Sequence, residues 1–203
     1  MLYTIGHSTH TAEALLELLK LHKISCVVDV RSKPFSRIAP QFNKDRISSF
    51  LNLNGIIYMH LPDEFGARKI SIALLDKEGK VDFEKVRQTE SFKEGIKRVK
   101  QGLEIGYSIA LLCAEANPFD CHRFVMISYQ FAKDGIDVYH ILKDGTCLTN
   151  KALDEMLLKK YAEKLPRESL FEPEPTHQEK LDCAYRLRNK DIAYLISEEN
   201  SGL

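Results

Sequence analysis

Apolar residues in this sequence occur in two alternating patterns, one typical of strands and one typical of helices. This alternation constrains the fold more than any other feature. Short apolar runs, typical of buried strands, are followed by stretches in which apolar side chains recur at the spacing of a helix. The run at residues 2–5, for example, precedes Leu15, Leu18 and Leu19, with Thr11 as a candidate helix cap. Strands separated by helices favour parallel pairing, because parallel strands need long crossover connections. We therefore predict an α/β fold, with a mostly parallel sheet flanked by helices on both faces.

Further strands and helix caps follow from the same pattern. Thr149 stands at the position of a cap for a helix that contains Leu153 and Leu157. The segment at residues 91–94 has the sequence of a capping box. The predicted strands lie at residues 2–5, 26–30, 56–60, 107–113 and 136–142.

The composition changes after Pro166, and this change divides the chain. Residues 166–175 contain two further prolines and several acidic side chains, as expected of a linker. Thr176 and Glu179 then form a capping-box signature at the start of another helix. We predict an α/β domain at residues 1–165, and a linker with a C-terminal helical tail at residues 166–203. The tail is expected to pack as an arm, either on the domain or on a second copy of the chain, which would give a homo-oligomer.

The charge balance excludes some classes of protein. The 203 residues include 29 basic and 29 acidic side chains, and the sequence pI is near 7.0. The chain therefore lacks the global positive charge that drives strong non-specific binding to nucleic acid, although one local site for a nucleotide or a nucleic-acid end stays open. The sequence contains neither an apolar stretch of membrane-spanning length nor a signal-like N-terminal segment. We expect a cytoplasmic protein with no membrane partner.

Five cysteines are scattered along the sequence without a C-x-x-C pair, so a disulfide framework is not expected. Cys26 begins an apolar run and is expected to be a small buried hydrophobe. Cys147 and Cys183 do not belong to a constellation of reactive side chains in the sequence. These three are assigned no function, which leaves Cys113 and Cys121 as candidates for thiol chemistry.

Polar side chains follow several predicted strands at the points where the strands end. Because the carboxyl ends of parallel strands meet at one edge of the sheet, these side chains should share a ligand-binding edge. The guanidinium groups among them suit a phosphate, a sulfate or a carboxylate. For the pair Asp29 and Arg31, a local ion pair is the alternative. The candidate residues for binding a substrate anion are His7, Ser8, Asp29, Arg31, Arg37 and Arg123.

The segment at residues 108–123 concentrates the reactive groups. An apolar run ends at Cys113, and Cys121 and His122 follow after a short loop. We predict that Asp120 caps a helix beginning at Cys121, which would place both residues in its first turn. The positive end of a helix favours the thiolate form of a cysteine, whereas the Asp120 charge opposes it. The same helix end would accept an anion, so this segment is the predicted centre of the chemistry.

We assign catalytic roles to four residues of this segment. Cys113 or Cys121 would be the nucleophile, and His122 or Glu115 would move protons. The substrate would be a small anion or a nucleotide that contains phosphate or sulfur, and no cofactor is expected. The sequence contains neither the phosphate-loop motif nor the glycine motif of dinucleotide-binding proteins.

A metal site is the alternative use of the same side chains, since thiols, imidazoles and carboxylates are all zinc ligands. Two features argue against it. The spacing Cys-x7-Cys-His is not one of the usual structural patterns, and neighbours such as Cys121 and His122 point in different directions on a helix. We therefore assign no metal ligand.

Five motifs follow one another along the chain: Thr4-Ile-Gly-His-Ser8, residues 29–37, Tyr58 with Leu61-Pro62, residues 111–123 and residues 138–141. In this order they resemble the motifs of the family catalogued as domain of unknown function 488. The similarity covers about residues 1–145 and implies no established activity. One departure lies at residues 65–67, where the family pattern is richer in glycine.

Val28-Asp-Val-Arg31 lies in one predicted strand, and a later predicted strand ends at Cys113, followed by a loop and Arg123. This order is similar, though more weakly, to that of rhodanese-like domains, in which an Asp-Val-Arg strand precedes a strand that ends at the active cysteine. This resemblance implies sulfur transfer by Cys113. With the alternation of strands and helices, the predicted three-layer fold is Rossmann-like or rhodanese-like. The loop between Cys113 and Arg123 departs from the family pattern, because it is longer and contains Pro118 and a second cysteine.

Three hypotheses for the function follow. The favoured one is an enzyme that acts at an anion-binding cleft, through a reactive cysteine or an acid/base pair. The second is a non-enzymatic module that binds a nucleotide or nucleic acid through the same arginines. The third is a metal-dependent hydrolase that uses the same cysteines, histidine and carboxylate.

Overall fold

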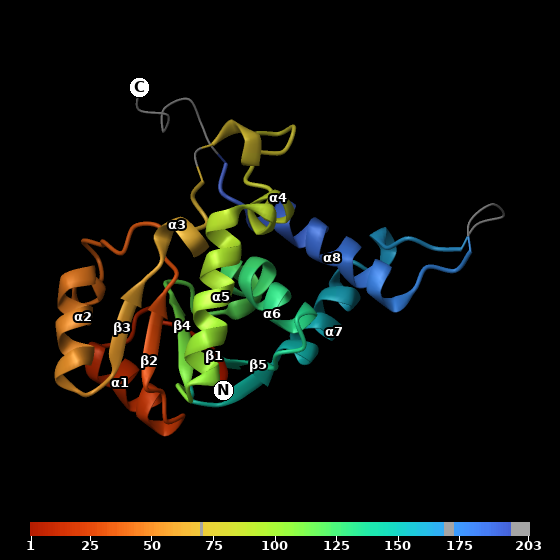
Figure 1. Ribbon diagram of the computed structural model, residues 1–203. Coiled ribbons are helices and arrows are strands. Elements are labelled where there is room, and N and C mark those ends of the chain that lie inside the picture. The colour runs from red at the N-terminus through yellow and green to blue at the C-terminus, as the bar shows by residue number, and fades with distance from the viewer. Residues whose placement is uncertain (70, 169–172, 196–203) are drawn as a thin grey trace.

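The computed structural model describes residues 1–69, 71–168 and 173–195, and a six-stranded sheet forms its centre (Figure 1). The strands are β1 (Leu2–Gly6), β2 (Cys26–Asp29), β3 (Ile57–His60), β4 (Ile109–Cys113), β5 (Val138–Ile141) and β6 (Cys147–Thr149). They lie in the order β3-β2-β4-β1-β5-β6. Strands β1 to β5 pair in parallel, and β6 is antiparallel to β5. The prediction of a mostly parallel sheet is confirmed.

Helices cover both faces of the sheet, as predicted (Figure 1). The α-helices are α1 (Ala12–Leu21), α2 (Lys44–Leu53), α3 (Pro62–Phe65), α4 (Phe83–Gln88), α5 (Glu90–Glu104), α6 (Tyr129–Lys133), α7 (Asn150–Lys160) and α8 (His177–Ile192). Helices α1 and α2 form a core with one face of the sheet. Helices α3 to α8 contribute to the core on the opposite face, so the fold has three layers.

The alternation of side chains along each strand decides which groups reach which face. On β4, Ala110 and Leu112 join the core under α1 and α2. Leu111 and Cys113 join the core under α5 and α6. Cys113 therefore lies at the carboxyl end of a central strand, on the α5 side of the sheet.

Three of the predicted helix caps are confirmed. The hydroxyl groups of Thr11, Thr149 and Thr176 each accept a hydrogen bond from a backbone N–H of the following helix. Thr176 also forms the predicted capping box with Glu179. These caps are local features, and each depends on side-chain type and position at the end of an extended segment.

The capping box predicted at residues 91–94 is wrong. Helix α5 begins at Glu90, because Thr89 is extended (φ −68°, ψ 147°) and its hydroxyl accepts the N–H of Phe92 at 3.3 Å. Strand β6 was not predicted either, since it has three residues and none of them is buried. Both differences lie outside the strands that carry the candidate site.

The C-terminal helix α8 packs on the rest of the described chain. The side chain of Tyr185 is 3% exposed, and its ring centroid lies 4.4 Å from that of Tyr129 and 5.2 Å from that of Phe124. Its hydroxyl donates to Asp154 at 2.5 Å. Helix α8 thus helps to bury the helical segment that follows β4. The predicted tail extends to residue 203, but residues 169–172 and 196–203 lie outside the described part of the chain.

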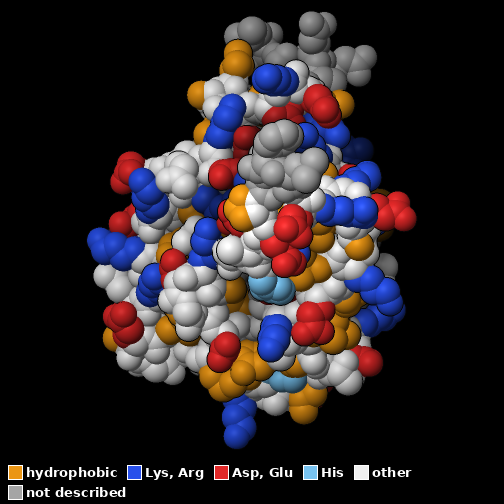
Figure 2. Space-filling view, turned by 90° about the vertical axis from the view of Figure 1, so that its right-hand side faces the viewer, with side chains coloured by type: hydrophobic (Ala, Val, Ile, Leu, Met, Phe, Trp, Pro, Cys, Tyr) orange, Lys and Arg blue, Asp and Glu red, His pale blue; other side chains and the backbone are white. Residues whose placement is uncertain are grey.

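The side of the molecule that carries α7 and α8 shows basic and acidic side chains interspersed with apolar ones (Figure 2). This mixture agrees with the equal numbers of basic and acidic residues in the chain. None of the helices within the described ranges is long and apolar enough to cross a membrane.

Replacing Tyr185 with alanine should destabilise the protein, because the change removes a buried aromatic side chain between α8 and the core. We expect the free energy of unfolding, measured by urea denaturation, to fall by ~3–5 kcal/mol. Arg186→Ala is the control, since Arg186 is an exposed neighbour on the same helix. It should change the free energy of unfolding by less than ~0.5 kcal/mol. An equally small effect of Tyr185→Ala would show that α8 is not part of the core in solution.

Candidate functional site

The loops after β1 and β4 lie at the position where α/β proteins bind ligands. The two strands are neighbours, but the chain leaves them toward opposite faces of the sheet. It continues from β1 to α1 on one face, and from β4 to the π-helical turn Arg123–Ser128 and α6 on the other. In open parallel sheets, such a divergence of connections creates a crevice at the carboxyl ends of the strands.

The loop after β4 crosses directly over the end of β1. The backbone N–H groups of His7 and Ser8 donate to the carbonyl oxygens of Cys113, the last residue of β4, and Ala114, the first of the loop, both at 2.9 Å. A Cβ atom on Gly6 would lie 1.8 Å from the carbonyl oxygen of Glu115. Two backbones therefore approach so closely that only glycine fits at this position, and the contact fixes the place of Glu115.

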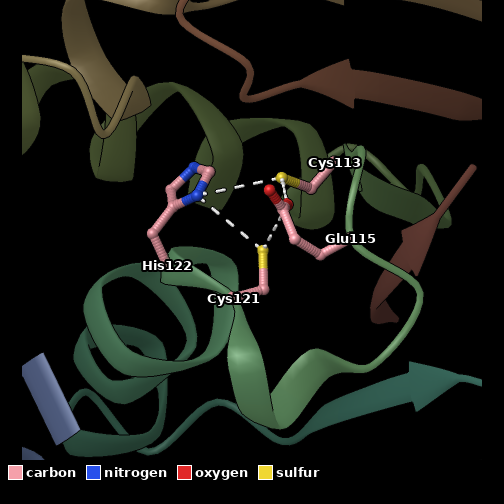
Figure 3. A group of neighbouring side chains, drawn as sticks. All are labelled: Cys113, Glu115, Cys121 and His122. Atoms are coloured by element: carbon pink, nitrogen blue, oxygen red, sulfur yellow. Dashed lines mark hydrogen bonds between the residues drawn. The ribbon is translucent and has the colours of Figure 1, made fainter. Parts of the chain in front are cut away.

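The helical segment after β4 begins one residue later than predicted. Cys121 is extended (φ −126°, ψ 144°), and its Sγ accepts the backbone N–H of Arg123 at 3.5 Å, as a capping side chain does. Helical conformation starts at His122 (φ −59°, ψ −25°). Asp120, the predicted cap, instead forms an ion pair with Arg188 on α8. Because Cys121 precedes the helix, its side chain and that of His122 point to the same place (Figure 3).

Four side chains converge at this point: Cys113, Glu115, Cys121 and His122 (Figure 3). Each offers one sulfur, oxygen or nitrogen atom, and these atoms all lie within 4.8 Å of one another. Oε2 of Glu115 is 2.7 Å from Sγ of Cys113 and 3.2 Å from Sγ of Cys121. Nδ1 of His122 is 3.8 and 3.7 Å from the same two sulfur atoms. The structure thus brings together the four residues for which we predict catalytic roles.

The cluster is buried on one side and open on the other. Cys113 and Cys121 are 2% and 1% exposed, whereas Glu115 is exposed and His122 is half-buried. Nε2 of His122 lies 3.2 Å from the carbonyl oxygen of Val30 and donates to it, because a carbonyl oxygen only accepts. In a neutral His122, Nδ1 therefore presents a lone pair to the two sulfur atoms.

The two thiols differ in acidity. Burial raises the pKa of Cys113 well above its usual value, and the neighbouring Cys121 and Glu115 raise it further. Burial also acts to raise the pKa of Cys121, but the hydrogen bond from Cys113 and the charges of Arg123 and His122 lower it well below its usual value. Burial acts to lower the pKa of His122, but Cys121 and Glu115 outweigh this effect and raise it. Cys121 is therefore the more acidic of the two thiols, and His122 is shifted toward its protonated form.

Arg123 is fully buried and holds the loop that carries Glu115. Its Nη1 and Nη2 atoms donate to the carbonyl oxygens of Glu115 at 2.7 Å and Ala116 at 3.0 Å. Its Nε donates to the hydroxyl of Thr4 on β1 at 3.2 Å. A buried charge needs such partners, because leaving it unpaired is costly. The structure places this predicted anion ligand among protein acceptors, where it positions Glu115.

Arg123 depends in turn on a buried chain of hydrogen bonds. Because the amide oxygen of Asn150 only accepts, Nε2 of His140 donates to it at 3.3 Å, and Nδ1 of the neutral ring accepts from the Thr4 hydroxyl at 2.9 Å. Burial, followed by the Arg123 charge, lowers the pKa of His140 to about 3. His140 is therefore neutral near pH 7. The sequence gives no sign of this role, because Thr4 and His140 are 136 residues apart.

A second polar group lies at the same edge, on the α2 side of the sheet. The carboxylate of Asp29 accepts hydrogen bonds from Nε and Nη2 of Arg31, at 2.9 and 2.5 Å, and from the hydroxyl of Tyr58 at 2.6 Å. Nη1 of Arg31 donates to Nε2 of His7 at 3.1 Å, and the His7 ring stacks on Phe42. Burial and the Arg31 charge lower the pKa of His7 to about 4. Asp29 and Arg31 thus form the local ion pair that we gave as the alternative to a role in anion binding.

The remaining predicted residues lie apart from the cluster. Ser8 contributes its backbone and has a left-handed conformation (φ 42°), and Arg37 is exposed on the loop between β2 and α2. A cavity of about 320 Å³ lies between α5 and strands β2 and β3. Its lining includes none of the predicted site residues, so the anion-binding cleft stays a prediction.

Replacing Gly6 with alanine should displace Glu115, because the new Cβ would overlap its carbonyl oxygen. We expect the free energy of unfolding, measured by urea denaturation, to fall by ~1–3 kcal/mol, as at other overpacked sites. Gly102→Ala is the control, since its Cβ would meet only the flexible end of the Ile109 side chain, at 2.9 Å, on a helix that alanine favours. Equal stability of the two variants would contradict the close approach at Gly6.

The low pKa of His140 predicts a loss of stability in acid. The unfolded chain binds a proton near pH 6.5, whereas the folded chain resists it until about pH 3. The stabilisation is therefore complete above pH 6.5 and is lost progressively below it. Between neutral pH and about pH 5 the loss from His140 should be ~2 kcal/mol.

The variant His140→Gln checks this contribution. Urea denaturation with EDTA at both pH values should show a pH dependence smaller by ~2 kcal/mol than in the wild type. His7 and the acidic side chains should contribute equally in both proteins, so the difference isolates His140. An unchanged pH dependence would mean that the His140 imidazole is not held neutral.

Comparison with known proteins identifies a family. The family model described as "Domain of unknown function DUF488" matches residues 11–130, which is more than half of the chain and includes the whole cluster. This match confirms the first resemblance seen in the motifs, while the similarity to rhodanese-like domains stays a prediction. No curated protein and no solved structure matches the chain.

Proposed function

The chain belongs to the DUF488 family, and we propose that it is a metal-dependent hydrolase. In this proposal Cys113, Cys121 and His122 bind a zinc ion, and Glu115 is a fourth ligand that water or substrate displaces. One observation carries the proposal. Four side chains of the types that bind zinc converge on one point, from positions before, within and after the loop that follows β4.

The distances in the cluster suit a tetrahedral ion. Zinc lies about 2.3 Å from sulfur and about 2.0 Å from nitrogen, which places these ligand atoms about 3.5 Å apart in a tetrahedron. Nδ1 of His122 is 3.8 Å from Sγ of Cys113 and 3.7 Å from Sγ of Cys121. The His122 ring therefore needs to move by only a few tenths of an ångström, whereas Oε2 of Glu115, 2.7 Å from Sγ of Cys113, would move outward by about 1 Å through its side-chain torsions.

The surroundings of His122 also support its role as a zinc ligand. Histidines that bind a metal usually donate their other ring N–H to a carbonyl or carboxylate group, and Nε2 of His122 donates to Val30. The divergence of Cys121 and His122 on a helix, which the sequence analysis counts against a metal site, does not occur, because Cys121 lies before the helix. The unusual spacing has a structural reason as well: the loop between the cysteines contains the 3-10 helix Pro118–Asp120.

Two features favour a catalytic ion over a structural one. Structural zinc sites stabilise the fold directly, often in small domains, whereas this cluster lies on a complete α/β core, at the ligand-binding position of such sheets. Glu115 is also the most exposed of the four ligands, so its place is accessible to water. A bound zinc ion would make water acidic near neutral pH, and the carboxylate of Glu115 would accept the released proton.

A thiol enzyme is the second candidate, and the acidity of Cys121 favours it. Its Sγ accepts the N–H of Arg123, and its pKa lies well below the usual value. Cys121 would attack a phosphate- or sulfur-containing substrate, with His122 and Glu115 moving protons. The Cys121 side chain is 1% exposed, however, so attack would require the loop with Glu115 to open. The hydrolase needs no such opening, and we prefer it for this reason.

The metal content of the purified protein distinguishes the metal-dependent hydrolase from the thiol enzyme. Protein purified without chelators should contain stoichiometric zinc by elemental analysis. Cys113→Ser, Cys121→Ser and His122→Ala should each lose most of the metal, because each removes or weakens a ligand. Cys147→Ser is the matched control and should keep the metal, since Cys147 is an exposed thiol outside the cluster.

Glu115→Gln separates metal binding from catalysis. This variant should keep zinc through the three remaining ligands but hydrolyse a panel of phosphate and carboxylate esters about 100-fold more slowly, because the proton acceptor is lost. Wild-type protein that takes up no metal, and whose Cys121 reacts rapidly with iodoacetamide in the native state, would contradict the hydrolase and support the thiol enzyme.

A further inference from the structure

The loop between β2 and α2, with the first turn of α2, is a surface that the proposed hydrolase site does not use. Residues 33–46 follow β2 at the edge of the sheet where the cluster also lies. We propose that this segment binds single-stranded nucleic acid, through several phosphates and an unstacked base. The inference concerns the ligand of this surface, and it holds whether or not the cluster carries a metal ion.

Two large apolar side chains of the segment face the solvent. Phe35 is 71% exposed and Ile38 is 97% exposed. Single exposed apolar residues are common, but two within one loop mark a surface that gains from being covered. A planar base would cover the Phe35 ring by stacking, and this contact tolerates any base because every base has a π-face.

The loop is held in shape by its own hydrogen bonds. The N–H of Lys44 donates to the carbonyl oxygen of Pro34 at 2.9 Å, and the N–H of Ser36 donates to Oδ1 of Asn43 at 2.7 Å. The hydroxyl of Ser36 accepts the N–H of Ile38 at 3.2 Å. The exposed side chains are therefore presented on an ordered backbone, so binding would cost little ordering of the loop.

The segment is also strongly basic in a chain that has no net charge. It carries four basic side chains and one acidic one, which gives a local charge of +3 (4 − 1). All four basic side chains are exposed, and within the described residues none forms an ion pair. The side of the molecule in Figure 2, by contrast, intermixes both signs. The residues are Lys33, Arg37, Lys44 and Arg46, with Asp45 as the acidic one.

The order of these side chains favours a nucleic-acid strand over a lipid surface. Arg37 lies between Phe35 and Ile38 in the loop, so insertion of both apolar side chains into a bilayer would carry a cation toward the hydrocarbon, which is costly. A single strand alternates phosphates and bases at short intervals. Cations interleaved with an aromatic ring match that alternation.

Fluorescence anisotropy with a labelled oligothymidylate of about 12 nucleotides tests the proposal on the full-length protein. The oligonucleotide should bind at low salt, and log K should fall against log salt with a slope of about −2 to −3, as expected for three or four phosphate contacts. Phe35→Ala and Arg37→Ala should each weaken binding by about 5- to 100-fold. The affinity should be the same with and without EDTA, which separates this surface from the proposed metal site.

Two matched controls lie outside the segment. Ile105→Ala removes an apolar side chain that is 75% exposed, and Lys159→Ala removes an exposed cation on α7. Both should bind the oligonucleotide as the wild type does. Equal weakening by these controls would mean diffuse binding and would overturn the proposal.

Three other results would also overturn the proposal. The first is an absence of oligonucleotide binding at low salt. The second is competition by AMP at the same concentration as the oligonucleotide, which would assign the surface to a free nucleotide. The third is binding to phosphatidylserine vesicles that Phe35→Ala abolishes, without binding to the oligonucleotide, which would assign it to a membrane.

Discussion

The buried guanidinium of Arg123 is the interaction on which the candidate site depends. It joins Thr4 on β1 to the carbonyl oxygens of Glu115 and Ala116 in the loop after β4. Because an unpaired buried charge costs several kcal/mol, this loop cannot move away without a large loss of stability. The glycine at position 6 fixes the same loop from its other side, through backbone contact. Together these contacts hold Glu115 beside two thiols that the hydrophobic core already surrounds.

The two groups of polar side chains at this edge of the sheet differ in whether their polar atoms remain available to a ligand. The carboxylate of Asp29 and the guanidinium of Arg31 are bound to each other and to neighbouring side chains, so this group stabilises the fold. In the cluster of Cys113, Cys121 and His122, two sulfur atoms and a ring nitrogen face one another instead. Sulfur and nitrogen atoms that converge on one point suit a metal ion, and for this reason we propose that this side of the sheet carries the chemistry.

Much of the fold and the members of the cluster could be predicted from the sequence, because they depend on spacing along the chain. The strand that ends at Cys113 and the threonine caps are of this kind. The convergence of Cys121 and His122 could not be predicted, since it depends on a shift of one residue in the start of a helix. Because of that shift, the divergence of Cys121 and His122 on a helix no longer argues against a metal site. The support from His140 could not be found either, because its partner Thr4 is distant in sequence.

X-ray absorption at the zinc edge of the purified protein tests the proposed metal site, since it reports the atoms around the ion. We expect stoichiometric zinc with two sulfur ligands at about 2.3 Å and two nitrogen or oxygen ligands at about 2.0–2.1 Å. Replacing Cys121 with serine should remove the ion or reduce the sulfur contribution by half. A wild-type protein without stoichiometric metal, or with an ion bound by nitrogen and oxygen alone, would rule out a metal site built on Cys113 and Cys121.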